Sequence, residues 1–168
     1  MVIKRCFIFR LKIGLQNRQA DYLRYKLKQY RMVTAKIVYK GELCTSATHV
    51  KSDSKILTDA PTDNNGLGRT FSPTDLLATS LASCMITIMG IRANESSLNI
   101  EGTNANVTKI MGSNPRRVSE VKVDIEIYDR GLTGVQKQVL EKAALSCPVA
   151  LSLSESLKQS VSFSYKEG

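Results

Sequence analysis

Hydrophobic and polar positions along the chain predict a protein that mixes strands and helices. Four apolar residues from Val121 to Ile127 occupy every second position, and polar or charged side chains fill the places between them. This period of two is typical of a strand with one buried face. Residues 33–58 hold two or three shorter β-rich runs, separated by Gly41 and by the polar residues 52–54, and they predict an antiparallel meander.

The longest uncharged stretch predicts a central helix. Residues 76–91 contain no charged side chain, and "SPTD" just before them places Ser72 at the N-cap, Pro73 at the first helical position and Asp75 at the third. This order is close to a capping box. Such a stretch, with several Ser and Thr, is short and polar for a membrane span, so we expect a helix buried in a protein core.

The remaining patterns complete a single α+β domain without repeats. A loop rich in Pro, Asn and Gly covers residues 60–71 and precedes the central helix. After the helix we expect a β-hairpin over residues 98–129, helices over 131–147 and 148–158, and a last strand over 160–165. A helix that is apolar all round needs cover on every side, and this chain has few elements to give it. We therefore expect a homodimer that completes the core.

Charge is concentrated at one end of the chain. The formal net charge is +9, from 24 Lys and Arg against 15 Asp and Glu, but residues 1–31 alone carry nine of the basic residues and one acid. The other 137 residues are nearly neutral, at +1. Nucleic-acid binding by the domain itself therefore loses its main support.

The basic segment 1–31 stands apart from the predicted domain, which covers residues 32–168. Composition changes at Met32, so the segment is either a native extension or sequence upstream of a start at Met32. It lacks the apolar stretch and small-residue cleavage site of a secretory signal. A basic amphipathic arm that touches a membrane, a nucleic acid or another partner is a further interpretation.

Four cysteines and one histidine limit the chemistry. No CxxC pair occurs among Cys6, Cys44, Cys84 and Cys147, and the spacing of a structural zinc site is absent. We expect no metal and no cofactor. Without an export signal the expected location is the reducing cytoplasm, where a pairing of cysteines is transient and catalytic rather than structural.

The four thiols differ in their sequence surroundings. Cys6 lies in the basic segment, and Cys44 has no basic neighbour in "LCTSATHV", so both are expected to be packing residues or incidental thiols. Cys84 lies in the central helix and is either a small core residue or a reactive thiol. Cys147 precedes Pro148 at a helix start, where the positive end of the helix dipole favours a thiolate, although a plain N-cap is the alternative.

Two motifs together resemble a known family. "SPTDLLATSLASCMIT" follows the loop "TDAPTDNNGLGRTF", and "ALSCPVALSLSESL" comes later in the chain. In this order and element context they resemble the OsmC/Ohr family, that is, osmotically inducible protein C and the organic hydroperoxide resistance proteins. The resemblance covers residues 32–165.

The resemblance implies an α+β fold of antiparallel sheets packed around a long buried central helix, in an intertwined homodimer. It also implies a thiol-dependent peroxidase for organic hydroperoxides. Cys84 matches the peroxidatic cysteine, which becomes a sulfenic acid, and Cys147 matches the resolving cysteine, which closes a disulfide. A dithiol, of lipoyl type in some relatives, restores both thiols.

The chain departs from the family pattern near Cys84. The best-studied members of the family carry a Glu ten residues before the peroxidatic cysteine, paired with an Arg, and Thr74 stands at that position here. Asp75 is one residue later and about 180° around the helix from Cys84, which favours a capping role over a catalytic one.

Two residues are candidates for the catalytic cation, and His49 is a further candidate site residue. Arg69 in the preceding loop is either the catalytic cation or a solvated residue, and Arg92 is a weaker candidate. His49 is either near the site or satisfied locally. In the competing interpretation, the chain is an OsmC-like protein that binds a small apolar ligand or senses redox state. Thr74, at the position of the Glu, is the sequence feature that favours it.

Overall fold

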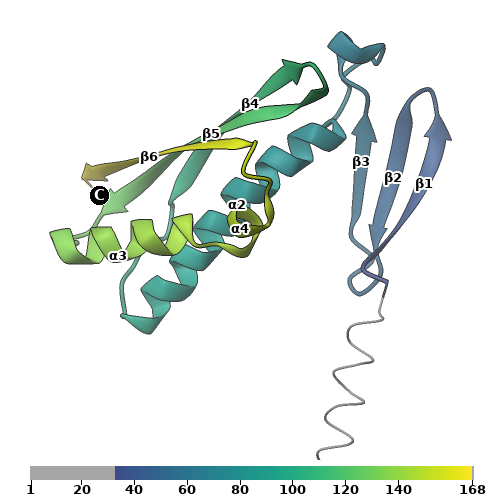
Figure 1. The fold of residues 1–168 in the computed structure, drawn as a ribbon. Coiled ribbons are helices and arrows are strands. Elements are labelled where there is room, and N and C mark those ends of the chain that lie inside the picture. Colours follow the sequence, from purple (N-terminus) through teal and green to yellow (C-terminus); the bar gives the residue numbers. More distant parts are fainter. Residues whose placement is uncertain (1–32, 168) are drawn as a thin grey trace, which may run out of the picture. The chain divides into compact units, whose positions relative to one another are not determined.

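The computed structural model describes residues 33–167 (Figure 1). The basic segment 1–31 and Cys6 lie outside the described residues. The elements are β1 (Ala35–Gly41), β2 (Cys44–His49), β3 (Lys55–Asp59), the short 3-10 helix η1 (Thr62–Asn64), α2 (Pro73–Glu95), β4 (Asn104–Ser113), β5 (Arg116–Asp129), α3 (Gly134–Leu145), α4 (Pro148–Ser152) and β6 (Lys158–Glu167). The described chain divides into two units, residues 33–41 with 45–57, and residues 42–44 with 58–167.

The predicted meander is present as a three-stranded sheet in the order β1-β2-β3. Consecutive strands joined by such short turns pair antiparallel, because a parallel connection needs a long crossover. The turn after β2 closes when the His49 backbone N–H donates to the carbonyl of Ser54. Side chains of β1 are exposed on both faces, Ile37 and Tyr39 among them, so most of this small sheet is not buried within its own unit.

The second sheet has the order β4-β5-β6, and it differs from the prediction in one pairing. β4 and β5 form the expected antiparallel hairpin, with Val107 opposite Val123 and a register shift between Ile110 and Met111. β6 pairs with β5 in parallel. The expectation of purely antiparallel sheets is therefore wrong here, because α3 and α4 form the crossover that returns the chain in the same direction.

α2 begins where the sequence predicts. The Ser72 side chain accepts from the Asp75 N–H, and the Asp75 carboxylate accepts from the Ser72 N–H at 2.8 Å, which makes a complete capping box. Pro73 occupies the first turn, where its missing N–H costs nothing. At the other end, the Ser96 N–H bonds the carbonyls of Ala93 and Asn94.

Only one side of α2 is buried within the described chain. Ala78, Leu81, Met85 and Met89 are inaccessible to solvent or nearly so, and they pack in the core with β5 and α3. Another side carries exposed residues without charge: Ser80, Ser83, Thr87 and Ile91. The described residues of one chain therefore cover only part of the helix, and the expectation that a homodimer covers the rest stays a prediction.

The core joins α2 to the second sheet and to α3. The four residues that alternate in β5 are all buried, as predicted, with exposed fractions of 1% or less. Leu140 and Ala144 of α3 complete this layer. By length and composition alone α2 is also apolar enough to cross a membrane, but a core helix passes the same test, and the buried side of α2 packs into this core.

The helix pair after β5 is shorter than predicted. α3 starts at a second capping box, formed by Thr133 and Gln136. α4 starts at Pro148, as predicted, but ends at Ser152 rather than at residue 158. Beyond it, serine hydroxyls bond one another and the backbone locally, as between Ser154 and Ser156, and such bonds compete with helix.

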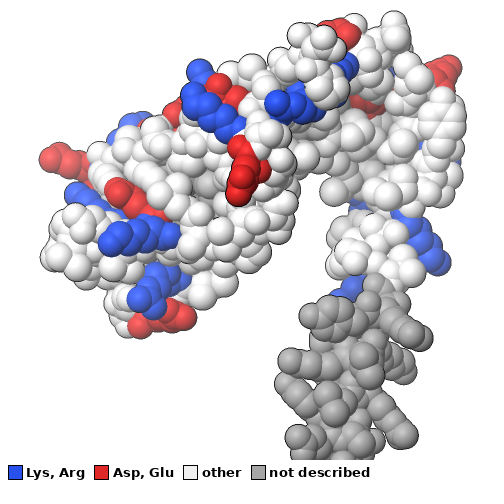
Figure 2. All heavy atoms as spheres, viewed as in Figure 1, with Lys and Arg blue, Asp and Glu red and all other residues white. Residues whose placement is uncertain are grey.

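Charges of both signs are interspersed on the face seen in Figure 2, and neither sign gathers into one large patch. Many of them are paired, for example Lys137 with Asp129 and Lys158 with Glu120. This surface agrees with the near-neutral charge of residues 32–168.

Candidate active site

Cys84 lies near the middle of α2, on the side that faces α3 and α4. It is partly buried and packs against the edge of the core. Small residues flank it in sequence, including Ala82, which is buried, and Ser83, which is exposed. The thiol therefore lies between core and solvent, a position from which a small molecule can reach it.

Cys147 is the N-cap of α4. Its backbone is extended, and its Sγ accepts from the Ala150 N–H at 3.4 Å. Cysteine here replaces the oxygen of the usual Ser or Asp cap. The side chain is fully buried, so this thiol is held rigidly and is not open to solvent.

The fold brings Cys84 and Cys147 together, which their separation of 63 residues cannot reveal. The two side chains are in hydrogen-bond contact, and both are free cysteines. Contact between the thiols joins the centre of α2 to the first turn of α4. The two sulfurs that a disulfide would join are therefore neighbours in the reduced protein.

Cys147 is held as a neutral thiol. Burial raises its pKa most, the Ala150 N–H opposes this, and the hydrogen bond with Cys84 and negative charge on that sulfur raise it further. The expectation of a dipole-stabilised thiolate at Cys147 is therefore wrong. α4 has only five residues, and its end effect does not offset complete burial.

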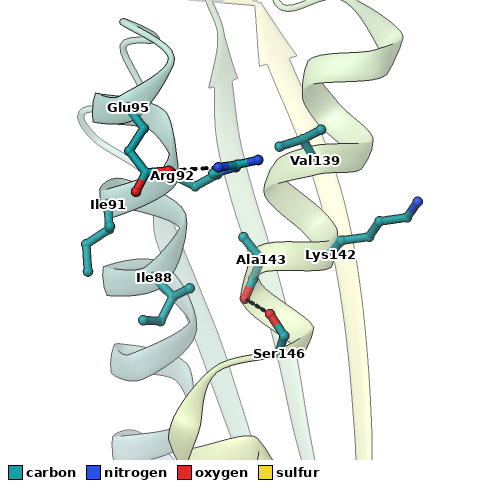
Figure 3. Close-up of a pocket in the computed structure, with 8 residues that line it drawn as sticks. All are labelled: Ile88, Ile91, Arg92, Glu95, Val139, Lys142, Ala143 and Ser146. Carbon is teal, nitrogen blue, oxygen red and sulfur yellow. Dashed lines mark hydrogen bonds and ion pairs between the residues drawn. The ribbon is translucent and has the colours of Figure 1, made fainter.

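A groove lies between α2 and α3 (Figure 3). It has a volume of about 400 Å³. Its lining comes from Ile88, Ile91, Arg92 and Glu95 of α2, and from Val139, Lys142, Ala143 and Ser146 at α3. Ile88 lies one helical turn after Cys84, and Ser146 directly precedes Cys147, so sequence neighbours of both cysteines line the groove.

Arg69 contacts Cys44 and Asp59, and no hydrogen bond or ion pair joins it to Cys84 in the described chain. Its backbone N–H and its Nε both donate to Asp59 Oδ2, at 3.0 and 2.9 Å. Its Nη2 donates to Cys44 Sγ at 2.8 Å, and Nη1 lies 3.6 Å from Glu42 Oε2. The structure thus gives the predicted cation a different thiol as its neighbour.

The surroundings of Cys44 correct the sequence interpretation, which found no basic neighbour. The Cys44 thiol donates to Asp59 Oδ1 at 3.3 Å while Arg69 donates to its sulfur. Burial and the hydrogen bond to Asp59 raise the pKa of Cys44, and the charge of Arg69 lowers it less. Hydrogen bonds from Arg69, first from its side chain and then from its backbone, lower the pKa of Asp59 to about 2.

Asp75 is a capping residue with a partner that the sequence interpretation missed. Lys109 Nζ lies 2.7 Å from Asp75 Oδ1 and also donates to Thr74 Oγ1 at 2.9 Å. Burial raises the pKa of Asp75, but hydrogen bonds from Lys109 and Ser72 together hold it below its usual range. Thr74, at the family's Glu position, therefore faces a lysine. One sequence signal was available: Lys109 occupies an inward-facing place in the alternation of β4.

The other candidates have local partners. His49 is in the unit of the meander. It pairs with the Ser52 hydroxyl at 2.7 Å, which is the local partner that one of the two sequence interpretations expects. Arg92 pairs with Glu95 at 2.8 Å on the surface of α2. Among residues 33–167 no three His, Cys, Asp or Glu side chains lie close enough together to hold a metal ion.

The model of OsmC-like proteins matches residues 65–162, which include both cysteines of the pair. This match spans more than half of the chain. The chain belongs to the OsmC family. A crystal structure from Psychrobacter arcticus 273-4, named as that of an osmotic stress induced and detoxification response protein, is 50% identical, with a TM-score of 0.76, over 79% of this chain and 96% of that one.

More distant OsmC structures share the fold. The OsmC-like protein of Mycoplasma pneumoniae is 20% identical, with a TM-score of 0.67, and covers 80% of this chain and 97% of its own. An organic hydroperoxide resistance protein OsmC from Legionella pneumophila is 18% identical, with a TM-score of 0.61, over 79% of this chain and 98% of its own. No functionally curated protein matches the sequence.

Proposed function

We propose that this OsmC protein is a thiol-dependent peroxidase that reduces organic hydroperoxides. The contact between Cys84 and Cys147 carries the proposal, because it pairs a partly exposed thiol with a buried neutral one. Two thiols held in contact need no large motion to form a disulfide. The groove between α2 and α3, lined by Ile88 and Ser146 next to the two cysteines in sequence, offers apolar walls for the organic group of the substrate.

Cys84 is the nucleophile in this proposal. Its deprotonated sulfur attacks the terminal oxygen of the hydroperoxide, the O–O bond breaks, and the alkoxide leaves as an alcohol after taking a proton. Cys84 becomes a sulfenic acid. Cys147 is unsuited to this first step, because it is inaccessible and its raised pKa keeps the proton on its sulfur.

Cys147 resolves the sulfenic acid. Its sulfur attacks Cys84 Sγ, the S–S bond forms, and the hydroxyl leaves with the Cys147 proton as water. Hydroperoxide and two thiols thus give an alcohol, water and a disulfide. A dithiol reductant, which becomes a disulfide in turn, restores both cysteines, and we place the cycle in the reducing cytoplasm.

A homodimer belongs to the same proposal. The exposed side of α2 is uncharged from Ser80 to Ile91, and large apolar side chains such as Val135 and Leu151 are about three-quarters exposed. Burial of these side chains against a second copy would stabilise the assembly.

Mass mapping of disulfides tests the peroxidase. Reduced protein is treated with cumene hydroperoxide or hydrogen peroxide, quenched by alkylation and digested. We expect a Cys84–Cys147 bond that forms faster with the organic peroxide, that is lost in Cys84→Ser, and that is unchanged in the matched variant Cys44→Ser. A folded protein whose Cys84 remains a thiol under both peroxides would contradict the proposal.

A ligand-binding or redox-sensing role is the alternative, and Thr74 beside Lys109 favours it, since the family's carboxylate is absent there. Under this alternative a disulfide forms, but a dithiol reductant and peroxide give no sustained turnover. Continuous measurement of peroxide consumption separates the two functions.

A further inference from the structure

One face of the β1-β2-β3 sheet is basic. Side chains alternate along a strand, so Lys36, Val38 and Lys40 of β1 share one face (Figure 1). They line a hollow of about 390 Å³ together with residues from β2, from β3 and from the turn between these strands: Ser46, Thr48, Val50, Asp53 and Lys55. Three lysines and one aspartate give this lining a net charge of +2. We call this surface the lysine face.

No carboxylate among residues 33–167 pairs with the lysines of this face. Lys36, Lys40 and Lys55 are exposed, and their side chains form no hydrogen bond or ion pair within that range. In the other unit, by contrast, Lys109 and Lys137 are each paired with an aspartate. The three ammonium groups of the lysine face are therefore free to meet negative charge on another molecule.

The opposite face of the same sheet is apolar. Ile37 and Tyr39 of β1 point to that side, as does Ile56 of β3, and their exposed fractions are 69%, 64% and 49%. A second copy of the chain suits this apolar face, as in the proposed homodimer. The two faces of a sheet point in opposite directions, so a molecule that covers the apolar face leaves the lysine face in solvent.

The side chains of the lysine face fit a membrane of anionic lipids better than a nucleic acid. Its lining residues include no aromatic ring and no arginine. It therefore lacks the platforms on which bases stack and the forked donors that read guanine. Val38 and Val50 lie among the lysines and are 56% and 44% exposed. Apolar side chains beside basic ones are typical of surfaces that enter the boundary between headgroups and acyl chains.

The basic segment 1–31 is not the occupant of this face. It carries nine basic residues against one acid, a net charge of +8, and like charges repel. Lys36 follows the segment by only five residues in the chain. An anionic membrane would attract both, because their charges have the same sign.

We propose that the lysine face binds the surface of a membrane that contains anionic lipids. Each lysine close to such a surface strengthens binding roughly fivefold, so Lys36, Lys40 and Lys55 together contribute on the order of 100-fold. The contact is peripheral, since side chains of a sheet make it. It does not depend on the proposed peroxidase function, because none of these residues belongs to the thiol site.

Vesicle binding tests the contact with the full chain. The probes are vesicles of phosphatidylcholine alone and vesicles with about 30% phosphatidylglycerol, sedimented with the protein at 50 and 300 mM salt. We expect binding to the anionic vesicles only, and weaker binding at the higher salt, because salt screens exposed charges. Equal binding to both kinds of vesicle would overturn the proposal, as would no binding at 50 mM salt.

A triple variant assigns the binding to the lysine face. Lys36→Gln, Lys40→Gln and Lys55→Gln together should lower the partition coefficient by on the order of 100-fold. The matched control removes three exposed lysines that lie outside this face: Lys122→Gln, Lys142→Gln and Lys158→Gln. The control loses the same net charge and should stay within about threefold of the wild type. Melting curves by circular dichroism establish that both triple variants are folded.

Asp53→Asn gives a test that loss of folding cannot imitate. It removes the one negative charge of the lysine face and should strengthen binding to anionic vesicles roughly fivefold. The backbone of Asp53 has φ +56°, which asparagine also adopts readily, so the turn is retained. Binding that does not rise in this variant would contradict a contact at this face.

The remaining outcomes identify what else would bind. An equal loss in both triple variants would show that binding follows net charge, and unchanged binding in the lysine-face variant would assign it to other residues. Either result overturns the proposal. A labelled duplex of 20 base pairs, measured by fluorescence anisotropy, tests a nucleic acid in the same way. If the duplex binds more tightly than the vesicles and is lost in the lysine-face variant, the face belongs to a nucleic acid and the membrane proposal is overturned.

Discussion

Two thiols of the same unit, Cys84 and Cys44, have opposite kinds of neighbour. Cys84 contacts a second thiol, Cys147, and among the residues that the structure describes no arginine or carboxylate is bonded to it. Cys44 lies between the guanidinium of Arg69 and the carboxylate of Asp59, and no second thiol is in contact with it within residues 33–167. The resemblance led us to expect a thiol, a guanidinium and a second thiol at one site, and the structure divides them between two places.

A basic neighbour alone therefore does not lower the pKa of a cysteine. Arg69 forms an ion pair with Asp59. One carboxylate oxygen of Asp59 accepts from the guanidinium and the backbone N–H of Arg69, and the other accepts from the Cys44 thiol. Asp59 thus removes much of the effect that Arg69 would have on the sulfur. At Cys84, the neighbour on which the proposed peroxidase depends is the thiol of Cys147.

The largest expected effect comes from Cys147→Ser. Without a second sulfur, the Cys84 sulfenic acid persists, and peroxide consumption with a dithiol reductant should fall by on the order of 100-fold. Stability should change little, because serine is a good N-cap for α4. Dimedone labelling at the Cys84 peptide, read by mass spectrometry, detects the sulfenic acid. Rapid turnover in this variant would mean that Cys147 is not the resolving thiol.

A smaller effect is expected from Asp59→Asn, which lowers thermal stability. The pKa of Asp59 is about 2, below its usual value of 3.8, so its ionised form stabilises the fold above about pH 4. This contribution is lost as the pH falls toward 2. At pH 7 the melting temperature should drop by on the order of 5 °C.

The difference in melting temperature between wild type and Asp59→Asn should narrow as the pH is lowered from 5 to 2. Melting curves by circular dichroism at four pH values measure it. A difference that stays constant over this range would show that the negative charge of Asp59 is not what stabilises the loop before α2.

The smallest expected effects are changes in the reactivity of Cys44, and they distinguish the influence of Arg69 on its pKa from that of Asp59. Arg69→Met removes the charge that lowers the pKa of Cys44 and should slow its alkylation by iodoacetamide at pH 8. Asp59→Asn removes a contribution that raises that pKa and should speed the reaction. Each change should be on the order of threefold. The rate is read at the Cys44 peptide, and the same direction in both variants would indicate altered exposure rather than altered charge.

Patterns that lie within one element were predictable from the sequence. The capping box at Ser72 and Asp75, the alternation from Val121 to Ile127 and the helix start at Pro148 all follow from local backbone chemistry, and all are present. The short end of α4 was missed because its serines satisfy backbone groups without extending the helix.

Features that depend on contacts between distant residues were not predictable from spacing. The parallel pairing of β6 depends on how α3 and α4 return the chain, and the partners of Arg69 come from positions 10 and 25 residues away. The contact of Cys84 with Cys147 came only from the resemblance to a family. The upward shift of the Cys147 pKa was not predicted, because the burial that causes it is a property of the fold, whereas a helix start is visible in the sequence.

Through Lys109, the start of α2 depends on a contact with strand β4, whereas an ordinary helix cap depends only on residues next to it in sequence. Its ammonium holds Thr74 and Asp75 from the neighbouring strand β4, so the first turn of α2 cannot unwind without breaking a tertiary contact. Terminal turns usually fray and exchange their amide hydrogens quickly. In this protein the amide protons of the first turn of α2 should exchange together with those of the hairpin, so that helix start and hairpin open as one cooperative unit.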